Sequence, residues 1–342
     1  RRPPRSTLFP YTRSSDLKDP DSVSQEWRDY FSKANGKSVI AIPTNGRTAI
    51  NHKPLAYADS TPNAERVEMD KLTELPNIPT KIAENMEESL TVPTATSVRS
   101  IPVKPLDENR RIINKYLLRQ RRSKISFSHL LLWAIVKTLK EYPSLNDNFV
   151  KKDGKYYRQI NDKINIGVAV DVEKSNGDRF LLVPNLKDAG SLNFSDFIEG
   201  LFDLIERAKN SKLKLEELEG TTVSLTNPGM IGTIMSVPRL MNGQGMIIAS
   251  GSIDYPAEFS AVKPDKLTEL AISKVVQITN TYDHRIIQGA ESAEFLRYMH
   301  QLLIGENRFY DQIFASLKIP FSPVKWEIDV SDSTKSEMNN RT

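Results

Sequence analysis

The stretch Thr279–Gly289, Thr-Asn-Thr-Tyr-Asp-His-Arg-Ile-Ile-Gln-Gly, separates two runs of different periodicity. Lys274–Ile278 before it is a β-type run, and Ala290–Leu303 after it has the pattern of a helix. We therefore expect His284 at a strand-to-helix corner, where a side chain can reach a cleft. Two interpretations stay open here: a general base, or a turn histidine that caps the strand end.

Apolar runs elsewhere in the chain predict further elements. Thr221–Thr226 and Met246–Gly251 are β-branched or apolar and are bounded by Gly, Pro or Asn, which indicates strands. Lys163–Val172 alternates, and Phe180–Pro184 closes a hairpin with it through a turn-rich segment. Helical spacing predicts helices over three segments: Asp107–Arg122, Ser126 to just before Pro143, and Asn193–Ser211.

Composition excludes several classes of protein. Without cysteine, the chain has no disulfide, zinc-thiolate site or cysteine nucleophile, which fits a reducing cytoplasm. The net charge of +4 is small, and no basic stripe carries interleaved aromatics, so we expect no nucleic-acid partner. The longest apolar run, Leu130–Val136, is too short for a bilayer span of ~20 residues, so no membrane partner is expected either.

The first part of the chain differs in texture from the rest. Residues 1–15 are a mixture of Pro, Arg and Ser that we set aside as a tail, not necessarily native. Residues 16–31 predict a short helix with Trp27, Tyr30 and Phe31 on one face, which packs either on its own domain or on a partner subunit. Residues 32–91 hold five prolines without an apolar period and are expected to be a disordered linker.

Two turn-rich loops at strand ends carry the candidate chemistry. Thr226 offers a hydroxyl and His284 an imidazole, which suits base-assisted transfer with a hydroxyl stabilising an oxyanion. Spacing alone does not say whether the two loops meet. Gly243-x-Gly245 enters a strand and opens no helix, so we reject a dinucleotide fingerprint, and we expect no metal site. His129, on a mostly buried helix, is expected to be a core histidine with its polar end satisfied.

Several motifs together resemble one family. Thr281–Gly289 resembles the histidine signature of the dihydrolipoyl acyltransferases of 2-oxo acid dehydrogenase complexes, which are related to chloramphenicol acetyltransferase. Gly220–Thr233 and Leu181–Ala189 are similar to two further motifs of that family. Pro93–Arg99 and Ser236–Gly245 resemble the acyltransferase domain fused at the front of actinobacterial-type 2-oxoglutarate dehydrogenase/decarboxylases.

The segment Asp19–Phe31 in turn looks like the N-terminal segment of 2-oxoglutarate dehydrogenases. The resemblance implies an α/β fold: a chloramphenicol acetyltransferase-like two-layer sandwich, with a mixed sheet and helices on one face, preceded by the disordered linker. It implies that residues 92–317 form the catalytic domain and that 318–342 begin a connection to a decarboxylase part. It also implies a homotrimer with each active site at a subunit interface.

The activity that the resemblance implies is succinyl transfer between dihydrolipoamide and CoA in the 2-oxoglutarate dehydrogenase system of the tricarboxylic acid cycle. His284 would be the general base, and Thr226 of a neighbouring subunit would stabilise the oxyanion. CoA is then a substrate, and the lipoyl group comes in trans from a lipoyl-bearing acyltransferase component, with dihydrolipoamide dehydrogenase as a further partner. Thiamine diphosphate and magnesium would belong only to the downstream part. The supporting site residues would be Asp283, Arg285, Gln288, Gly289 and Asn227.

Two departures from the family pattern keep alternatives open. Gln288 stands where the common family signature has Asp, so a structural ion pair would be missing. No lipoyl domain is present in the sequence. A trimeric assembly platform with little activity, which holds a thiamine-dependent decarboxylase, is therefore an alternative. A free CoA-dependent acyltransferase acting on a small acceptor is another.

Overall fold

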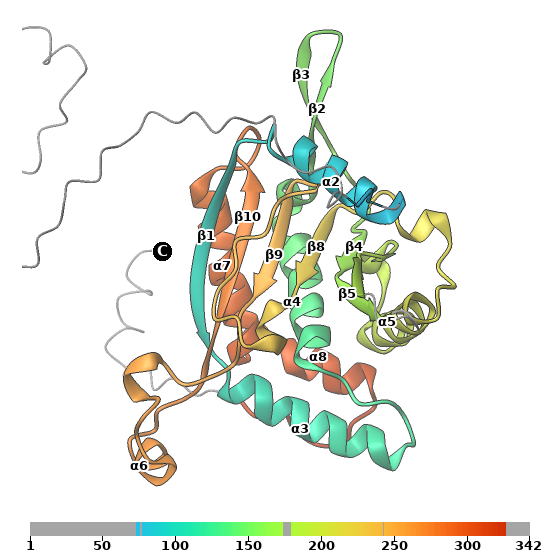
Figure 1. The fold of residues 1–342 in the computed structure, drawn as a ribbon. Coiled ribbons are helices and arrows are strands. Elements are labelled where there is room, and N and C mark those ends of the chain that lie inside the picture. The colour runs from blue at the N-terminus through green and yellow to red at the C-terminus, as the bar shows by residue number, and fades with distance from the viewer. Residues whose placement is uncertain (1–72, 76, 174–178, 242, 326–342) are drawn as a thin grey trace, which may run out of the picture. The chain divides into compact units, whose positions relative to one another are not determined.

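A six-stranded mixed sheet lies at the centre of the fold, with the strand order β1-β10-β9-β8-β4-β7 (Figure 1). The computed structural model describes residues 73–325, except 76, 174–178 and 242. Strands β9, β8 and β4 run parallel to one another, whereas β1, β10 and β7 are antiparallel to their neighbours. The strands are β1 (Thr94–Pro102), β4 (Ile166–Val168), β7 (Asn185–Leu186), β8 (Val223–Thr226), β9 (Met246–Ser250) and β10 (Val275–Asp283).

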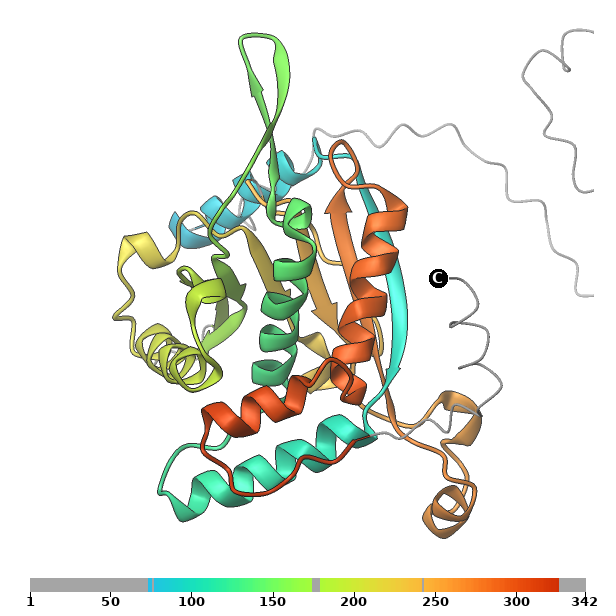
Figure 2. The ribbon, with the colours of Figure 1, turned by 180° about the vertical axis from the view of Figure 1, so that it is seen from behind.

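Helices cover one face of this sheet, and Figure 2 shows them in front of it. Helices α4 and α7 pack side by side on that face, and α3 and α8 cross its lower end. The arrangement confirms the expected two-layer α/β architecture with a mixed sheet and helices on one face. The helices are α2 (Asn77–Ser89), α3 (Lys104–Arg119), α4 (Phe127–Glu141), α5 (Phe194–Lys209), α6 (Pro264–Glu269), α7 (Gly289–Ile304) and α8 (Phe309–Ser316).

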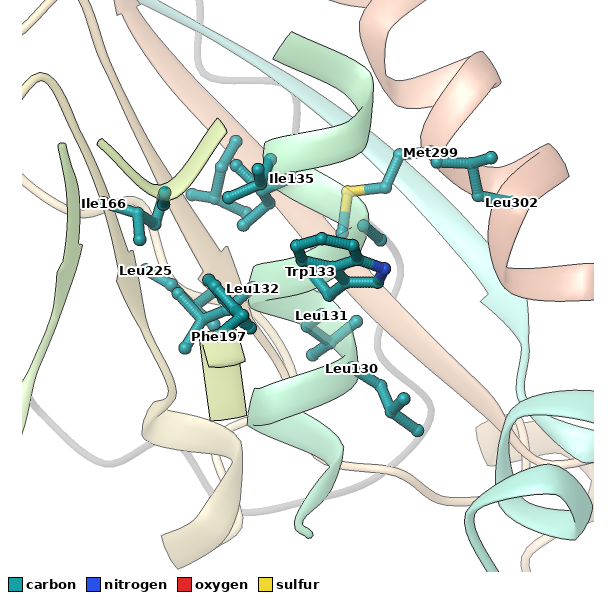
Figure 3. Close-up of a cluster of buried hydrophobic side chains, with 14 of the residues drawn as sticks. Leu130, Leu131, Leu132, Trp133, Ile135, Ile166, Phe197, Leu225, Met299 and Leu302 are labelled. Carbon is teal, nitrogen blue, oxygen red and sulfur yellow. The ribbon is translucent and has the colours of Figure 1, made fainter. Parts of the chain in front are cut away.

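Helix α4 is the centre of the core because its sequence is apolar on nearly every side. Trp133 packs against Phe194 and Phe197 of α5, with ring centroids 5.6 and 5.0 Å apart. Figure 3 shows this ring among leucine and isoleucine side chains from α4 and its neighbours. A helix that is hydrophobic all round must be covered on all sides, which places α4 between the sheet and the other helices. Its buried apolar residues include Leu130, Leu131, Leu132 and Ile135.

Most predicted elements are present with shifted ends. The buried helix before Pro143 is α4, and the predicted helix Asn193–Ser211 is α5. The expected hairpin is formed by β5 (Val170–Glu173) and β6 (Arg179–Leu182). The elements that were not predicted include the edge strand β1 and a separate two-stranded sheet of β2 (Asn148–Lys152) and β3 (Lys155–Gln159).

The prediction of a disordered linker over residues 32–91 is wrong for its last part. Helix α2 occupies Asn77–Ser89. Pro79 lies in its first turn, where a helix tolerates proline. Two of its apolar side chains, Ile82 and Met86, are spaced by one helical turn but are 40% and 37% exposed, so the sequence carries only a weak helical signal. Residues 1–15, 16–31, most of 32–91 and 326–342 lie outside the described residues.

Candidate active site

His284 stands at the corner where β10 ends, at Asp283, and before α7 begins, at Gly289. The strand-to-helix corner expected from the sequence is therefore confirmed. Backbone hydrogen bonds hold both sides of the corner. The His284 N–H donates to the Pro93 carbonyl (2.9 Å), and the Asp283 N–H donates to the Gly245 carbonyl (2.9 Å). The imidazole itself is exposed, so it can reach a substrate.

The ring of His284 is oriented by its own loop. Its Nδ1 lies 3.1 Å from the Ile287 carbonyl oxygen. Because a carbonyl only accepts hydrogen bonds, this contact assigns the proton to Nδ1 and leaves the lone pair on Nε2. The ring also packs edge-on against Tyr282, with centroids 5.6 Å apart. This tautomer and orientation suit a base that accepts a proton at Nε2.

Asp283 and Arg285 bind each other on either side of the histidine. Asp283 is buried, and its carboxylate accepts hydrogen bonds from Arg285 Nε (2.8 Å), Nη2 (2.6 Å) and backbone N–H (3.0 Å). The guanidinium also lies 3.7 Å from the centre of the Phe149 ring. Both charges are thereby used within the loop, so these residues position the turn that carries His284.

Gln288 caps the helix that follows. Its backbone N–H donates to Glu291 Oε2 (2.8 Å), and its side chain is exposed. The ion pair of this loop is formed by Arg285 with Asp283, and it does not involve position 288. A Cβ added to Gly289 would meet only the Tyr282 hydroxyl, at 3.6 Å, so this chain alone does not require glycine there.

Thr226 lies far from His284 within one chain. It pairs with Ala249 of β9, and Ala249 pairs with Thr279 of β10, five residues before His284. With strands ~4.8 Å apart and ~3.4 Å per residue, this register separates the two residues by about 20 Å. Asn227, next to Thr226, donates to Ser128 Oγ on α4 (2.9 Å). The single chain thus brings together His284, Asp283, Arg285, Gln288 and Gly289, but not Thr226 and Asn227.

The loop after Thr226 exposes an apolar surface that sequence reasoning missed. Met230 and Ile231 are 81% and 86% exposed, respectively. Exposed apolar clusters of this kind mark interaction surfaces. The signal in the sequence was the high density of large apolar residues within a turn-rich loop, interrupted between Met230 and Val237 only by Gly, Thr and Ser. The remaining exposed apolar residues of this loop are Ile234, Met235 and Val237.

The other two described histidines are placed differently from His284. Burial lowers the pKa of His129 to about 4, and its Nδ1 accepts from the Ser126 N–H (3.1 Å). Its buried Nε2 has no partner among the described residues, so its polar end is only half satisfied, which partly corrects the prediction. Burial, and then the charge of Arg99, lower the pKa of His300. His52 lies outside the described residues.

Two cavities flank the ends of the sheet. One, of about 380 Å³, lies between the His284 loop and the hairpin β2–β3, and Arg285 and Gln288 are among its lining residues. Another, of about 570 Å³, lies between the start of α3 and the segment 253–274 and is lined by neither His284 nor Thr226. Within the described ranges, no group of three acidic or histidine side chains could hold a metal ion. No helix in the part that the structure describes could cross a membrane.

A family match identifies the chain as carrying an acyltransferase catalytic domain. Residues 68–309 match the 2-oxoacid dehydrogenases acyltransferase (catalytic domain) family, and the chain belongs to that family. Among solved structures, a probable dihydrolipoamide acetyltransferase from Listeria monocytogenes shares the fold, with a TM-score of 0.57 and 21% identity over 75% of this chain and 99% of that chain. Azotobacter vinelandii dihydrolipoamide acetyltransferase also has a TM-score of 0.57, with 24% identity over 72% of this chain and 94% of that chain.

The particular relatives are larger proteins. The chain is 48% identical over 256 residues to the multifunctional 2-oxoglutarate metabolism enzyme of Mycobacterium sp. (strain JLS), which covers 75% of this chain and 20% of that enzyme. The enzyme of the same name from Mycolicibacterium vanbaalenii is 47% identical over the same shares. The chain therefore spans about a fifth of the length of the curated relatives that it matches.

Proposed function

We propose that this domain transfers a succinyl group between dihydrolipoamide and CoA, with His284 as general base and Thr226 as oxyanion donor. The observation that carries the proposal is the exposed imidazole with Nδ1 toward the Ile287 carbonyl, which leaves Nε2 free to accept a proton. The acyltransferase class follows from the family, and the choice of succinyl rests on the relatives' name, because decarboxylation of 2-oxoglutarate leaves a succinyl group.

The proposed reaction is a base-assisted thioester exchange. His284 Nε2 takes the proton of the CoA thiol, whose free pKa is like the ~8.5 of cysteine, and the thiolate attacks the carbonyl carbon of succinyl-dihydrolipoamide. The Thr226 hydroxyl donates a hydrogen bond to the resulting oxyanion. When the tetrahedral intermediate collapses, the bond to the dihydrolipoyl sulfur breaks. That thiolate then takes the proton back from the imidazolium, so the CoA thiol is consumed, one dihydrolipoyl thiol is released and the histidine returns to its neutral form.

A second subunit is needed to complete this site. Within one chain, about 20 Å separates Thr226 from His284. The base and the oxyanion donor must act on the same thioester, so they have to lie much closer together. The exposed apolar loop that includes Met230 and Ile231 directly follows Thr226, so a neighbouring chain that covers it would bring a histidine near the hydroxyl. We propose a homotrimer as the assembly, with Asn227 holding its loop against α4 through Ser128.

Other assignments concern the parent protein. The longer relatives support a downstream thiamine-dependent decarboxylase, to which we assign thiamine diphosphate and magnesium. A lipoyl-bearing acyltransferase component would supply the acyl group in trans, and dihydrolipoamide dehydrogenase would reoxidise it. We place this activity in the tricarboxylic acid cycle and in the cytoplasm. The alternative of a weakly active assembly platform keeps one supporting observation, because Gln288 serves as a helix cap and adds no charge to the site.

The test is succinyl transfer by the 342-residue chain from succinyl-CoA, as acyl donor, to free dihydrolipoamide, as acyl acceptor, which runs the proposed exchange in its reverse direction. His284→Ala should lower turnover by about 10²- to 10⁴-fold, and Thr226→Val by about 10²- to 10³-fold, without dissociating the trimer in sedimentation velocity. His300→Gln is the control, since that histidine lies between α7 and β1 and is bound by Arg99. A folded wild-type trimer without turnover would instead select the assembly platform.

A further inference from the structure

The hairpin β2–β3 stands away from the body of the fold, at the end of the sheet where β10 finishes (Figure 1). All residues from 151 to 160 are exposed. They include two neighbouring tyrosines, with Tyr156 71% exposed, and also Ile160 at 74%. A small projecting hairpin buries almost nothing of its own, so its composition reflects what it binds more than what it stabilises.

The hairpin concentrates unpaired positive charge. Lys152 faces Lys155 directly across the strands, an arrangement of like charges that weakens a hairpin in isolation. Lys151 lies over the ring of Tyr156, 5.6 Å from its centre. Within the described part of the chain, none of these three lysines has an ion-pair partner, and the only acidic residue of the hairpin is Asp153. A surface of this kind fits an acidic protein face.

The base of the hairpin is bound to the loop that carries His284. Arg158 of β3 donates to the Ile286 carbonyl, and Phe149 of β2 lies under the Arg285 guanidinium at 3.7 Å. The cavity of about 380 Å³ lies between these same elements. The tip of the hairpin lies three residues beyond the Phe149–Arg158 pair, a distance of ~10 Å. A domain seated on the hairpin would therefore lie beside the loop that carries His284.

We infer that the β2–β3 hairpin docks an acidic face of the protein domain that carries the acyl group on its dihydrolipoyl arm. The inference rests on the proposed acyl transfer, because it names the partner of the same site. Charge complementarity favours this partner over a second copy of the chain, which has a net charge of +4. The apolar loop after Thr226, at the other end of β8, offers a second copy a surface without this charge conflict.

The experiment compares two acyl acceptors with one charge-reversed variant. The variant carries Lys151→Glu, Lys152→Glu and Lys155→Glu in the 342-residue chain. Succinyl-CoA is the acyl donor, and the acceptors are free dihydrolipoamide and an isolated dihydrolipoyl-bearing domain with an acidic surface. With the carrier domain as acceptor, kcat/KM of the variant should be at least about 10-fold below that of wild type at low salt, because KM rises. The kcat/KM of wild type should itself fall as the salt concentration rises. With free dihydrolipoamide, kcat/KM should stay within about 2-fold of wild type. A matched control reverses three other exposed lysines elsewhere: Lys115, Lys209 and Lys212.

A second readout separates docking from catalysis. Fluorescence anisotropy of the labelled carrier domain should report binding to the His284→Ala chain. That binding should be lost when the same chain also carries the three lysine-to-glutamate substitutions of the hairpin. Equal binding with and without the three hairpin lysines would overturn the inference, as would an equal loss in the matched control. A loss of turnover with free dihydrolipoamide as well would show that the hairpin only positions His284. Absence of wild-type transfer to free dihydrolipoamide would refute the proposed function and leave docking to be decided by the binding data.

Discussion

Protonation of His129 should destabilise this fold in acid, and the size of the effect follows from its burial. The imidazole is 8% exposed, its Nδ1 accepts from Ser126, and burial lowers its pKa from 6.5 to about 4. The unfolded chain therefore binds this proton more readily than the folded chain does. The stability contributed by the neutral ring is fully present above pH ~6.5 and is lost as pH falls through about 4. A shift of this size corresponds to about 3 kcal/mol between pH 7 and pH 4.

The comparison is between wild type and His129→Gln, measured by urea unfolding at both pH values and one protein concentration. Glutamine at this position keeps an acceptor for the Ser126 N–H, as in a capping box, but it cannot be protonated. From pH 7 to pH 4, the free energy of unfolding of wild type should fall by about 3 kcal/mol more than that of the variant, whatever the absolute stabilities. Equal losses in the two proteins would refute the assignment of a buried, neutral His129.

Three further substitutions test the site and its frame. Gly245→Ala should destabilise the fold by about 2 kcal/mol or more in chemical denaturation, because its Cβ would lie 2.0 Å from the Asp147 carbonyl oxygen; an unchanged midpoint would contradict this packing. Asp283→Asn should cost about 2 kcal/mol and lower turnover, because it leaves Arg285 without its carboxylate; full activity would show that the pair does not position the loop. Thr226→Ser should retain transfer because it keeps the hydroxyl, whereas Thr226→Val should lower transfer by about 10²-fold or more. Equal transfer by the two variants would show that the hydroxyl is not the oxyanion donor.

Gly289→Ala is the matched control for the glycine prediction. A Cβ at this position would meet only the Tyr282 hydroxyl, at the ordinary contact distance of 3.6 Å. The stability of this variant should stay within about 0.5 kcal/mol of wild type, since alanine also suits the first turn of α7. A cost equal to that of Gly245→Ala would mean that neither loss comes from the contact with the Asp147 carbonyl.

The elements that could be predicted are those whose sequence alone limits their environment. Helix α4 is apolar on almost every side, and the strands β8 to β10 are β-branched runs between turn residues. The edge strand β1 was missed because Thr94–Pro102 is rich in Thr and Ser and owes its conformation to pairing with β10. The hairpin β2–β3 had a usable signal in Asp153-Gly154, since both residues adopt the positive φ typical of a two-residue hairpin turn.

The candidate site could be predicted in part for a similar reason. The neighbours of His284 in the site lie within five residues of it in the sequence, so their grouping needed no tertiary information. The distance between Thr226 and His284 depends on the register of three strands, which a single sequence does not reveal. The difference between His284 and His129 likewise depends on burial, which separates an exposed imidazole from one whose pKa lies near 4.

The central claim is that each active site combines His284 of one subunit with Thr226 of another, and mixing two inactive chains tests it directly. His284→Ala and Thr226→Val chains, refolded or expressed together in equal amounts, would form mixed trimers. In a cyclic trimer, roughly a quarter of the sites would then pair an intact histidine with an intact threonine. We predict that roughly a quarter of wild-type transfer returns in the mixture. Mixed trimers that remain as inactive as either parent would contradict the shared site.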